Sequence, residues 1–142
     1  MSHFVDVKTN LTDLKCVAKA LERLGFKGKL EMHDKPQNLF GYHGDKRKQK
    51  AHLIIRRKYV GDSSNDIGFE KQSNGMIAAH ISEFDQGTGS YAGRKAKYGT
   101  QWQQKLFTFY AVEKAEDEYT RRGIKWTEDV DEKDRPRVRA FI

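Results

Sequence analysis

The amino-acid sequence predicts an α+β fold: an antiparallel-rich sheet with two helices packed on one face, in a single domain over residues 1–142. Three observations support this expectation. The chain is 142 residues long, which matches one domain of ordinary size. Short segments of alternating apolar and polar residues, separated by turn residues, are typical of antiparallel strands. Two further segments carry apolar residues at helical spacing, and Leu, Ile, Val and Phe together supply 30 residues for a small core.

The chain begins with a predicted strand and a predicted helix. Residues 3–8 alternate in polarity, so we expect a strand whose Val5 and Val7 side chains face the core. A helix follows, with Thr12 as the predicted N-cap and Gly25 as the stop signal. Its apolar stripe consists of Leu14, Val17, Leu21 and Leu24. This spacing predicts that the helix packs one side against the sheet.

Two hairpins are predicted next. Residues 28–33 and 38–43 flank a turn-rich stretch at 34–37, and residues 50–60 pair with residues 65–70. The apolar faces of the two strands determine the register of the second hairpin, because a slip of one residue would turn one face outward.

That register places Tyr59 opposite Ile67. It also places Arg56 across from Glu70 on the other face, where the two side chains would form an exposed ion pair. We therefore expect one apolar face and one charged face for this pair of strands.

A third strand is predicted over residues 76–84. Its outward-facing residues include His80 and Phe84, and its inward-facing residues are Ile77, Ala79 and Ile81. Residues 86–99 break the pattern with four glycines, two tyrosines and three basic residues. We expect this segment to be a long loop, mobile in the free protein and ordered on a partner.

The C-terminal third is predicted to contain one long helix and two strands. The helix covers residues 100–122, and its 113–118 portion reads as a solvated acidic face. Residues 124–127 and 136–142 are expected to close the fold as strands. The segment 128–134 between them is expected to be an acidic loop.

The net charge of +7 is concentrated in the first half of the chain. Residues 1–61 contain 14 basic and 6 acidic side chains, residues 62–99 contain 4 and 5, and residues 100–142 contain 9 of each. The densest basic runs are 45–50 and 56–58. Such asymmetry favours a polyanionic partner, while a solvated, solubilising surface is the alternative interpretation.

If both helices cover one face of the sheet, the other face is expected to be open, basic and aromatic. Single-stranded RNA modules use such faces to stack bases and to bind phosphates. The flanking basic run and the 86–99 loop would extend the surface. The residues expected to contact RNA or another polyanion are Lys46, Arg47, Lys48, Lys50, His52, Arg56, Lys58, His80, Phe84, Tyr91, Arg94, Lys95, Lys97 and Tyr98.

A protein partner is the alternative occupant of the same face. Ile54 and Phe84 would be apolar on an uncovered surface, which is typical of partner-binding surfaces. An assembly or adaptor subunit, including a homo-oligomer, therefore remains open beside RNA binding. The acidic 128–134 loop would be a second contact.

No motif points to catalysis or to a cofactor. The sequence has no phosphate-binding loop, nucleophile elbow or zinc-finger spacing. We therefore expect a non-enzymatic binding or accessory protein with no catalytic residue, no cofactor and no metal site. The predicted outward positions of His52 and His80 leave a metal site as an alternative. Cys16 has no adjacent base in the sequence that would activate its thiol.

The sequence carries no signal for a membrane or for secretion. No apolar run is long enough to span a bilayer, and the first residues show no secretory pattern. The single Cys16 fits a reducing compartment. These features predict a cytoplasmic protein without membrane contact.

Several motifs resemble one family. They are the Met1-Ser2-His3-Phe4 start, the helix from Asp13-Leu14 to Leu24-Gly25-Phe26, Gly41-Tyr42, Asp66-Ile67-Gly68-Phe69 and the Tyr110-Ala111 helix that ends in Gly123. Together they resemble the family of unknown function that includes the chloroplast conserved open reading frame 35 protein and its cyanobacterial relatives. The resemblance implies a shared order of elements, and the plastid stroma as the location if the chain is plastid-encoded. It assigns no catalytic residue.

Overall fold

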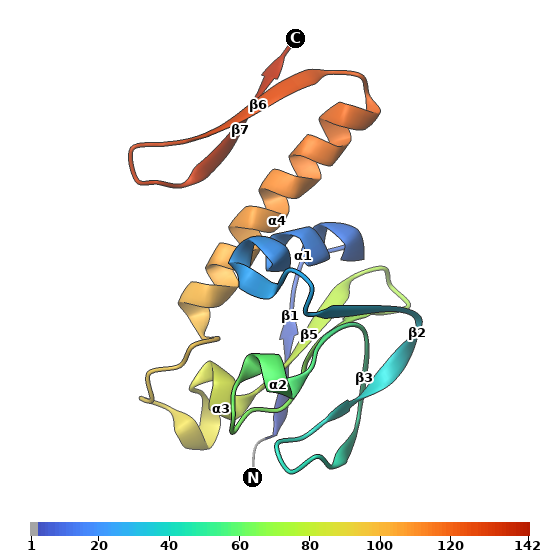
Figure 1. The fold of residues 1–142 in the computed structure, drawn as a ribbon, viewed down its shortest axis with the longest axis vertical. Coiled ribbons are helices and arrows are strands. Elements are labelled where there is room, and N and C mark those ends of the chain that lie inside the picture. The colour runs from blue at the N-terminus through green and yellow to red at the C-terminus, as the bar shows by residue number, and fades with distance from the viewer. Residues whose placement is uncertain (1–2) are drawn as a thin grey trace.

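Five strands form the main sheet of the chain (Figure 1). In spatial order they are β1 (Phe4–Lys8), β5 (Ile77–Ser82), β4 (Ile67–Lys71), β3 (Lys46–Ile55) and β2 (Leu30–Phe40). This computed structural model describes residues 3–142, so Met1 and Ser2 of the family-like start lie outside the described residues. All four strand pairings are antiparallel, which confirms the predicted α+β class.

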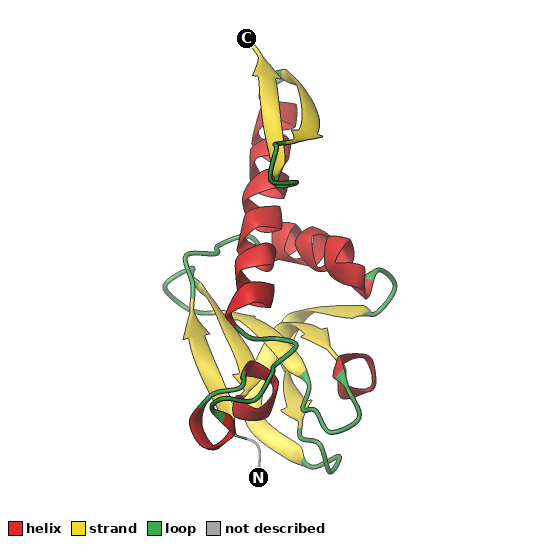
Figure 2. Cartoon of the chain, turned by 90° about the vertical axis from the view of Figure 1, so that its left-hand side faces the viewer, coloured by secondary structure: helices red, strands yellow, loops and turns green. Residues whose placement is uncertain are grey.

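Two helices cover one face of this sheet, as predicted. Helix α1 (Leu14–Leu21) and the first part of α4 (Thr100–Arg121) lie on the same side of the strands and pack against each other (Figure 2). The main core lies between these helices and the sheet; it includes Val17, Leu21, Leu53, Ile55, Ile67, Phe69, Ile77, Ala79, Ile81 and Leu106. The inward side of the third predicted strand is therefore confirmed.

The edge strand β1 is only partly covered by this core. Val7 packs against the core as predicted, whereas Val5 on the same face remains 37% exposed. The prediction for Val5 is therefore wrong. β1 is an edge strand, so neighbours cover its side chains from one side only.

The two ends of α1 follow its local sequence. Asp13, and not Thr12, is the N-cap, because its Oδ1 accepts hydrogen bonds from the amides of Lys15 and Cys16. A π-helical turn at Glu22–Phe26 follows the helix. Gly25 within this turn has φ of +101°, a left-handed conformation that glycine adopts without steric cost. The predicted stop signal is therefore confirmed.

The first predicted hairpin is wrong in its turn. Strand β2 continues through residues 34–37, and the reversal occurs at residues 41–45, where the Gly41 amide donates to the Asp45 carbonyl oxygen. The pairing of β2 with β3 shifts register between Met32 and Gln37. Pro36 lies inside this irregularity. Its missing N–H costs no ladder hydrogen bond there, so a proline that looked like a turn residue is tolerated in an edge strand.

The second predicted hairpin has the correct face and the wrong register. Ile55, and not Tyr59, is the partner of Ile67. Residues 57–60 leave the sheet and form the short helix α2 (Arg57–Val60). The shift is an even number of residues, so the apolar side chains still face the core. Arg56 consequently does not lie across from Glu70, and that predicted ion pair is wrong.

The second face of the sheet is covered, which contradicts the predicted open surface. Leu39, Ala51 and Ile54 form a second fully buried cluster, against which Phe4 packs. A Cβ built on Gly68 of β4 would lie 2.6 Å from the Ala51 Cβ and 2.8 Å from Leu39 Cδ2. The bent β2–β3 hairpin therefore folds over the face that the sequence predicted to be open (Figure 1).

Gly68→Ala is expected to destabilise the fold by about 1–3 kcal/mol, because the added methyl group overpacks this second cluster. Urea unfolding of both proteins measures the effect. Ser73→Ala, in the exposed turn between β4 and β5, is the control and should change the free energy of unfolding by less than about 0.5 kcal/mol. Equal stability of the Gly68 variant and the parent would contradict the close packing.

The C-terminal strands form a separate sheet at the far end of α4 (Figure 1). β6 (Lys125–Val130) pairs with β7 (Pro136–Phe141), so the two predicted strands exist but do not join the main sheet. Part of the predicted acidic loop, Glu128–Val130, belongs to β6. An isolated two-stranded sheet is marginally stable, so this hairpin depends on its packing against α4.

The acidic face predicted on the long helix is partly buried. The Arg23 side chain reaches Glu113 of α4 at 2.6 Å and Glu128 of β6 at 2.7 Å, and Glu116 beside them is only 8% exposed. These carboxylates therefore hold the hairpin and the π-helical turn against α4. In the part of the chain that the structure describes, no helix is both long and apolar enough to cross a bilayer.

Candidate polyanion-binding surface

The first basic run lies at the start of β3. Lys46, Lys48 and Lys50 occupy alternate positions and are exposed. Within the described range 3–142, none of their three side chains forms a hydrogen bond or an ion pair. Arg47 between them is half-buried, with its Nε 2.6 Å from Asp45 and its guanidinium 5.7 Å from the Phe4 ring. The three lysines are thus available to an external anion, whereas Arg47 supports the local structure.

In the second basic run, residues 56–58, the two arginine side chains form hydrogen bonds within the protein. Arg56 makes a two-bond contact with Glu31 at 2.8 and 2.9 Å and a third bond to Asp66 at 2.9 Å. The Arg57 guanidinium donates to backbone carbonyl oxygens of the neighbouring loops. Lys58 is exposed, with its ammonium 4.9 Å from the Tyr59 ring. Of this run, only Lys58 remains a candidate for contacts to phosphate.

The two predicted histidines differ in exposure, since His80 is buried and His52 is partly exposed. His80 is 4% exposed and bridges three strands, with its ring nitrogens 2.6 Å from Asp6 and 2.9 Å from Glu70. His52 accepts a hydrogen bond from the Lys71 amide through Nδ1. The expectation that His80 contacts a ligand is wrong, because the strand pairing surrounds it with its own carboxylates. The alternative of a metal site at His52 and His80 gains no support, because these two side chains do not belong to any cluster of potential metal ligands among the described residues.

Phe84 and the following segment form the second basic region. Phe84 lies in the short helix α3 (Glu83–Gln86), not in a strand. The Arg94 guanidinium lies 3.7 Å from the Phe84 ring centroid and donates to the Phe84 carbonyl oxygen at 2.7 Å. Tyr91 packs edge-on against the same ring. Phe84 is therefore half-buried, and its ring is not an open stacking platform.

Tyr98 at the end of this segment is a core residue. It is 1% exposed, and its hydroxyl donates to the Val60 carbonyl oxygen at 2.8 Å. Burial raises the pKa of Tyr98 to about 12. The expectation that Tyr98 stacks on a base is therefore wrong. Arg94, Lys95 and Lys97 remain exposed. Arg94 already contacts Phe84, so Lys95 and Lys97 are the more available cations of the predicted loop.

A small pocket lies between the loop 61–64 and the second basic region. Its volume is about 280 Å³, and its lining includes the loop 61–64, Phe84, Asp85, Arg94 and Lys97. Asp85 is 4% exposed and accepts hydrogen bonds from the Ser64 and Ser82 hydroxyls at 2.6 and 2.7 Å.

Burial raises the pKa of the Asp85 carboxyl. Its two hydroxyl contacts fasten the 61–64 loop to α3. This role of Asp85 was not predicted from the sequence, although a serine three residues before an aspartate is a recognisable capping pattern.

A series of contacts joins the two basic regions at one end of the molecule. Arg47 lies over Phe4, Phe4 pairs with Ser82, and Ser82 caps α3. Figure 1 shows α2, α3 and the β2–β3 turn at the end where the chain begins. Residues 41–64 and 83–99, which build this end, contain 10 basic and 4 acidic side chains. The structure thus replaces the predicted basic sheet face with a basic end, which consists of these two segments.

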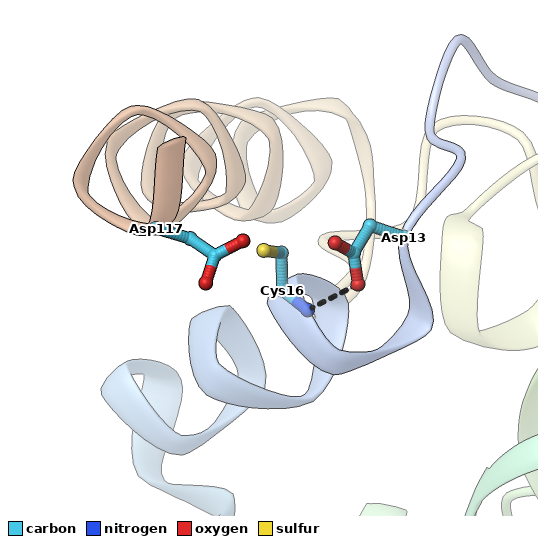
Figure 3. Close-up of side chains that lie close together, drawn as sticks. All are labelled: Asp13, Cys16 and Asp117. Atoms are coloured by element: carbon cyan, nitrogen blue, oxygen red, sulfur yellow. Dashed lines mark hydrogen bonds between the residues drawn. The ribbon is translucent and has the colours of Figure 1, made fainter. Parts of the chain in front are cut away.

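A second cluster of potential ligands lies between α1 and α4. Figure 3 shows the Cys16 thiol between the carboxylates of Asp13 and Asp117, with all ligand atoms within 4.8 Å of one another. Both oxygens of Asp13 are already used, by the helix amides and by Lys114 at 3.2 Å. Burial and the Asp13 charge raise the pKa of Cys16 to about 11. A thiol that stays protonated at neutral pH is a poor nucleophile. Cys16 is 1% exposed between α1 and α4 (Figure 3), so its side chain contributes to the packing of these two helices.

Comparison with known proteins adds no assignment. No protein-family model matches this chain. No curated protein and no solved structure matches it.

Proposed function

We propose that this chain is a non-enzymatic binding protein that contacts RNA, or another polyanion, through its basic end. The observation that supports this most directly is the set of exposed lysines at alternate positions of β3, which have no acidic partner among the described residues. Lys58, Arg94, Lys95 and Lys97 add cations at the same end. Clustered cations on one end, with few acidic neighbours, attract a phosphate backbone and make binding depend on salt.

The geometry favours a phosphate-dominated contact over base stacking. Tyr98 is buried, and Phe84 is covered by Arg94 and Tyr91. Because these two predicted stacking residues are covered, the basic end would recognise charge and shape more than base identity. Burial also argues against the alternative of a protein-assembly surface that includes Ile54 and Phe84. Ile54 is fully buried and cannot contribute to such a surface.

The salt dependence of RNA binding tests the proposal. Labelled single-stranded RNA is titrated at salt concentrations from about 50 to about 300 mM, and the slope of log K against log salt is measured. Replacing Lys46, Lys48 and Lys50 by alanine should reduce the slope by about 2, since each phosphate contact contributes about 0.7 for single strands. Arg47 is left in place because its contacts are internal.

The matched control replaces three exposed lysines away from the basic end, namely Lys15, Lys19 and Lys71. This variant has the same net charge as the test variant and should keep the slope of the parent. Equal losses in the two variants would mean that only net charge matters. That result, or absence of RNA binding by the parent at low salt, would overturn the proposal.

The two basic regions should act together. Replacing Arg94, Lys95 and Lys97 by alanine is expected to reduce the slope by about 2 as well, and combining both sets should lower it by about 4. The same titration measures both variants. If the second set changes nothing, the 86–99 segment is a connector and the binding surface is confined to β3.

A further inference from the structure

A groove lies beside α4, and none of its lining residues belongs to the two segments of the basic end. It has a volume of about 890 Å³ and runs between α4, the π-helical turn at Glu22–Phe26 and the turn of the β6–β7 hairpin. This size is typical of sites for small molecules. The groove shares no lining residue with the pocket beside α3, so a ligand here would be independent of the proposed RNA contact.

Cations from three separate segments converge on this groove. They are Arg23 of the π-helical turn, Lys105 of α4, and Lys133 and Arg135 of the hairpin turn, and Asp134 is the one carboxylate among the lining residues. Two of the cations are neutralised, because Arg23 binds Glu113 and Glu128 and Arg135 binds Asp131.

In contrast to Arg23 and Arg135, the side chains of Lys105 and Lys133 are not neutralised by any carboxylate of the described residues. Neither forms a hydrogen bond or an ion pair within the part of the chain that the structure describes. These two ammonium groups are therefore the ones available to a ligand.

The hairpin turn holds its cations in a defined arrangement. The Asp131 carboxylate accepts hydrogen bonds from the amides of Lys133 and Arg135, both at 2.9 Å. The Asp131 amide donates to the Arg135 carbonyl oxygen, which closes the turn. Asp134 within it has φ of +62°, a left-handed conformation. The backbone that carries Lys133 is thus fixed before any ligand binds.

The remaining lining is suited to an uncharged ring next to an anion. Phe109 and Pro136 supply apolar surface, and the Arg23 guanidinium lies 5.6 Å from the Phe109 ring. Gln101 and Gln104 of α4 add amide donors along one wall. A lysine ammonium binds phosphate as a point charge, and two of them balance a phosphate dianion.

We propose that this groove binds a small organic phosphate, with Lys105 and Lys133 at the phosphate and Phe109 and Pro136 against its ring. A nucleic-acid chain fits less well, because residues 128–134 beside the groove contain five carboxylates and one lysine. Those carboxylates would repel an extended polyanion, whereas a small ligand contacts only the groove.

Phenyl phosphate is the probe, and its binding is measured by calorimetry and by the amide NMR signals of residues 101–108 and 131–136. Phenyl phosphate should bind at least about fivefold more tightly than inorganic phosphate, because its ring is removed from water. The Lys105→Ala/Lys133→Ala variant should lose at least about tenfold in affinity, since both phosphate contacts are charge-assisted.

The control is Lys15→Ala/Lys71→Ala, which removes the same charge elsewhere and should bind phenyl phosphate like the parent. Circular dichroism and melting of both variants establish that each is folded. The variant lacking Lys105 and Lys133 should keep its affinity for RNA, which separates this site from the basic end. The proposal is overturned if the parent does not bind phenyl phosphate, if inorganic phosphate binds equally well, or if both variants lose the same affinity.

Discussion

Asp66→Ala is expected to destabilise the protein by about 3–5 kcal/mol, because it removes a buried charge from a fully paired network. The Asp66 side chain is 1% exposed. Its Oδ1 accepts from the Arg57 amide at 2.6 Å, and its Oδ2 accepts from the Phe40 amide at 2.7 Å and from Arg56 at 2.9 Å. Without the carboxylate, three donors on β2 and at the start of α2 would lose their acceptor inside the protein.

Chemical unfolding monitored by tryptophan fluorescence measures this loss. Asp62→Ala is the control, because Asp62 is exposed on the same loop and its change should stay within about 0.5 kcal/mol. Asp66→Asn keeps one oxygen acceptor and should fall between the two. A loss below about 1 kcal/mol for Asp66→Ala would mean that the network contributes little to holding the β2–β3 hairpin over the sheet.

The Asp66 network is an example of the long-range contacts that could not be predicted from the sequence. Polarity patterns identified the two long helices and the inward face of the third predicted strand, on which Ile77, Ala79 and Ile81 lie. They could not reveal that the β2–β3 hairpin bends over the second face. That bend depends on the irregular pairing around Pro36 and on contacts between Phe40 and Asp66, which are 26 residues apart. Such contacts leave no local pattern.

The prediction of the candidate site residues also depended on local sequence patterns alone. The density of basic residues in the run 45–50 marked it as a candidate surface, and Lys46, Lys48 and Lys50 of this run are exposed in β3. The alternation of apolar and polar residues predicted that His80 is exposed, because a histidine between apolar residues of a strand is expected on the solvent-facing side. The partners that allow His80 to be buried, Asp6 and Glu70, come from two other strands. A buried polar residue can be recognised only when its partners are known.

The stability of the C-terminal hairpin is expected to depend on pH through Glu116. This side chain faces Arg23 from the π-helical turn at 3.5 Å, Glu113 on its own helix and Glu128 from β6. The Arg23 guanidinium therefore forms ion pairs with three carboxylates. The Glu116 Oε2 atom is buried without a hydrogen-bond partner in the described part of the chain. Burial and the Glu128 carboxylate raise the pKa of Glu116 to about 7, while Arg23 lowers the pKa of Glu128 to about 2.

The sign of the effect follows from the raised pKa of Glu116. In the unfolded chain this group ionises near its ordinary pKa of 4.5, whereas the folded protein keeps it protonated to about pH 7. Its contribution to stability is complete below pH 4.5 and is lost as the pH rises through 7. Glu128 has the opposite dependence, and its contribution is lost only in strong acid as the pH falls toward 2. Between about pH 5 and about pH 8, the change therefore comes from Glu116.

Glu116→Gln removes this titration and keeps a donor toward Glu128. Relative to this variant, the parent should lose about 2 kcal/mol of stability between about pH 5 and about pH 8, because ionised Glu116 would place a third negative charge beside Arg23. Urea unfolding at both pH values measures the difference, and hydrogen exchange of the β6 and β7 amides should show the loosening at the hairpin. Glu118→Gln, exposed on the same helix, is the control and should keep the pH profile of the parent. Parallel profiles for the parent and Glu116→Gln would show that Glu116 is already ionised at acidic pH, and the hairpin would then be held by Arg23 against three charges throughout.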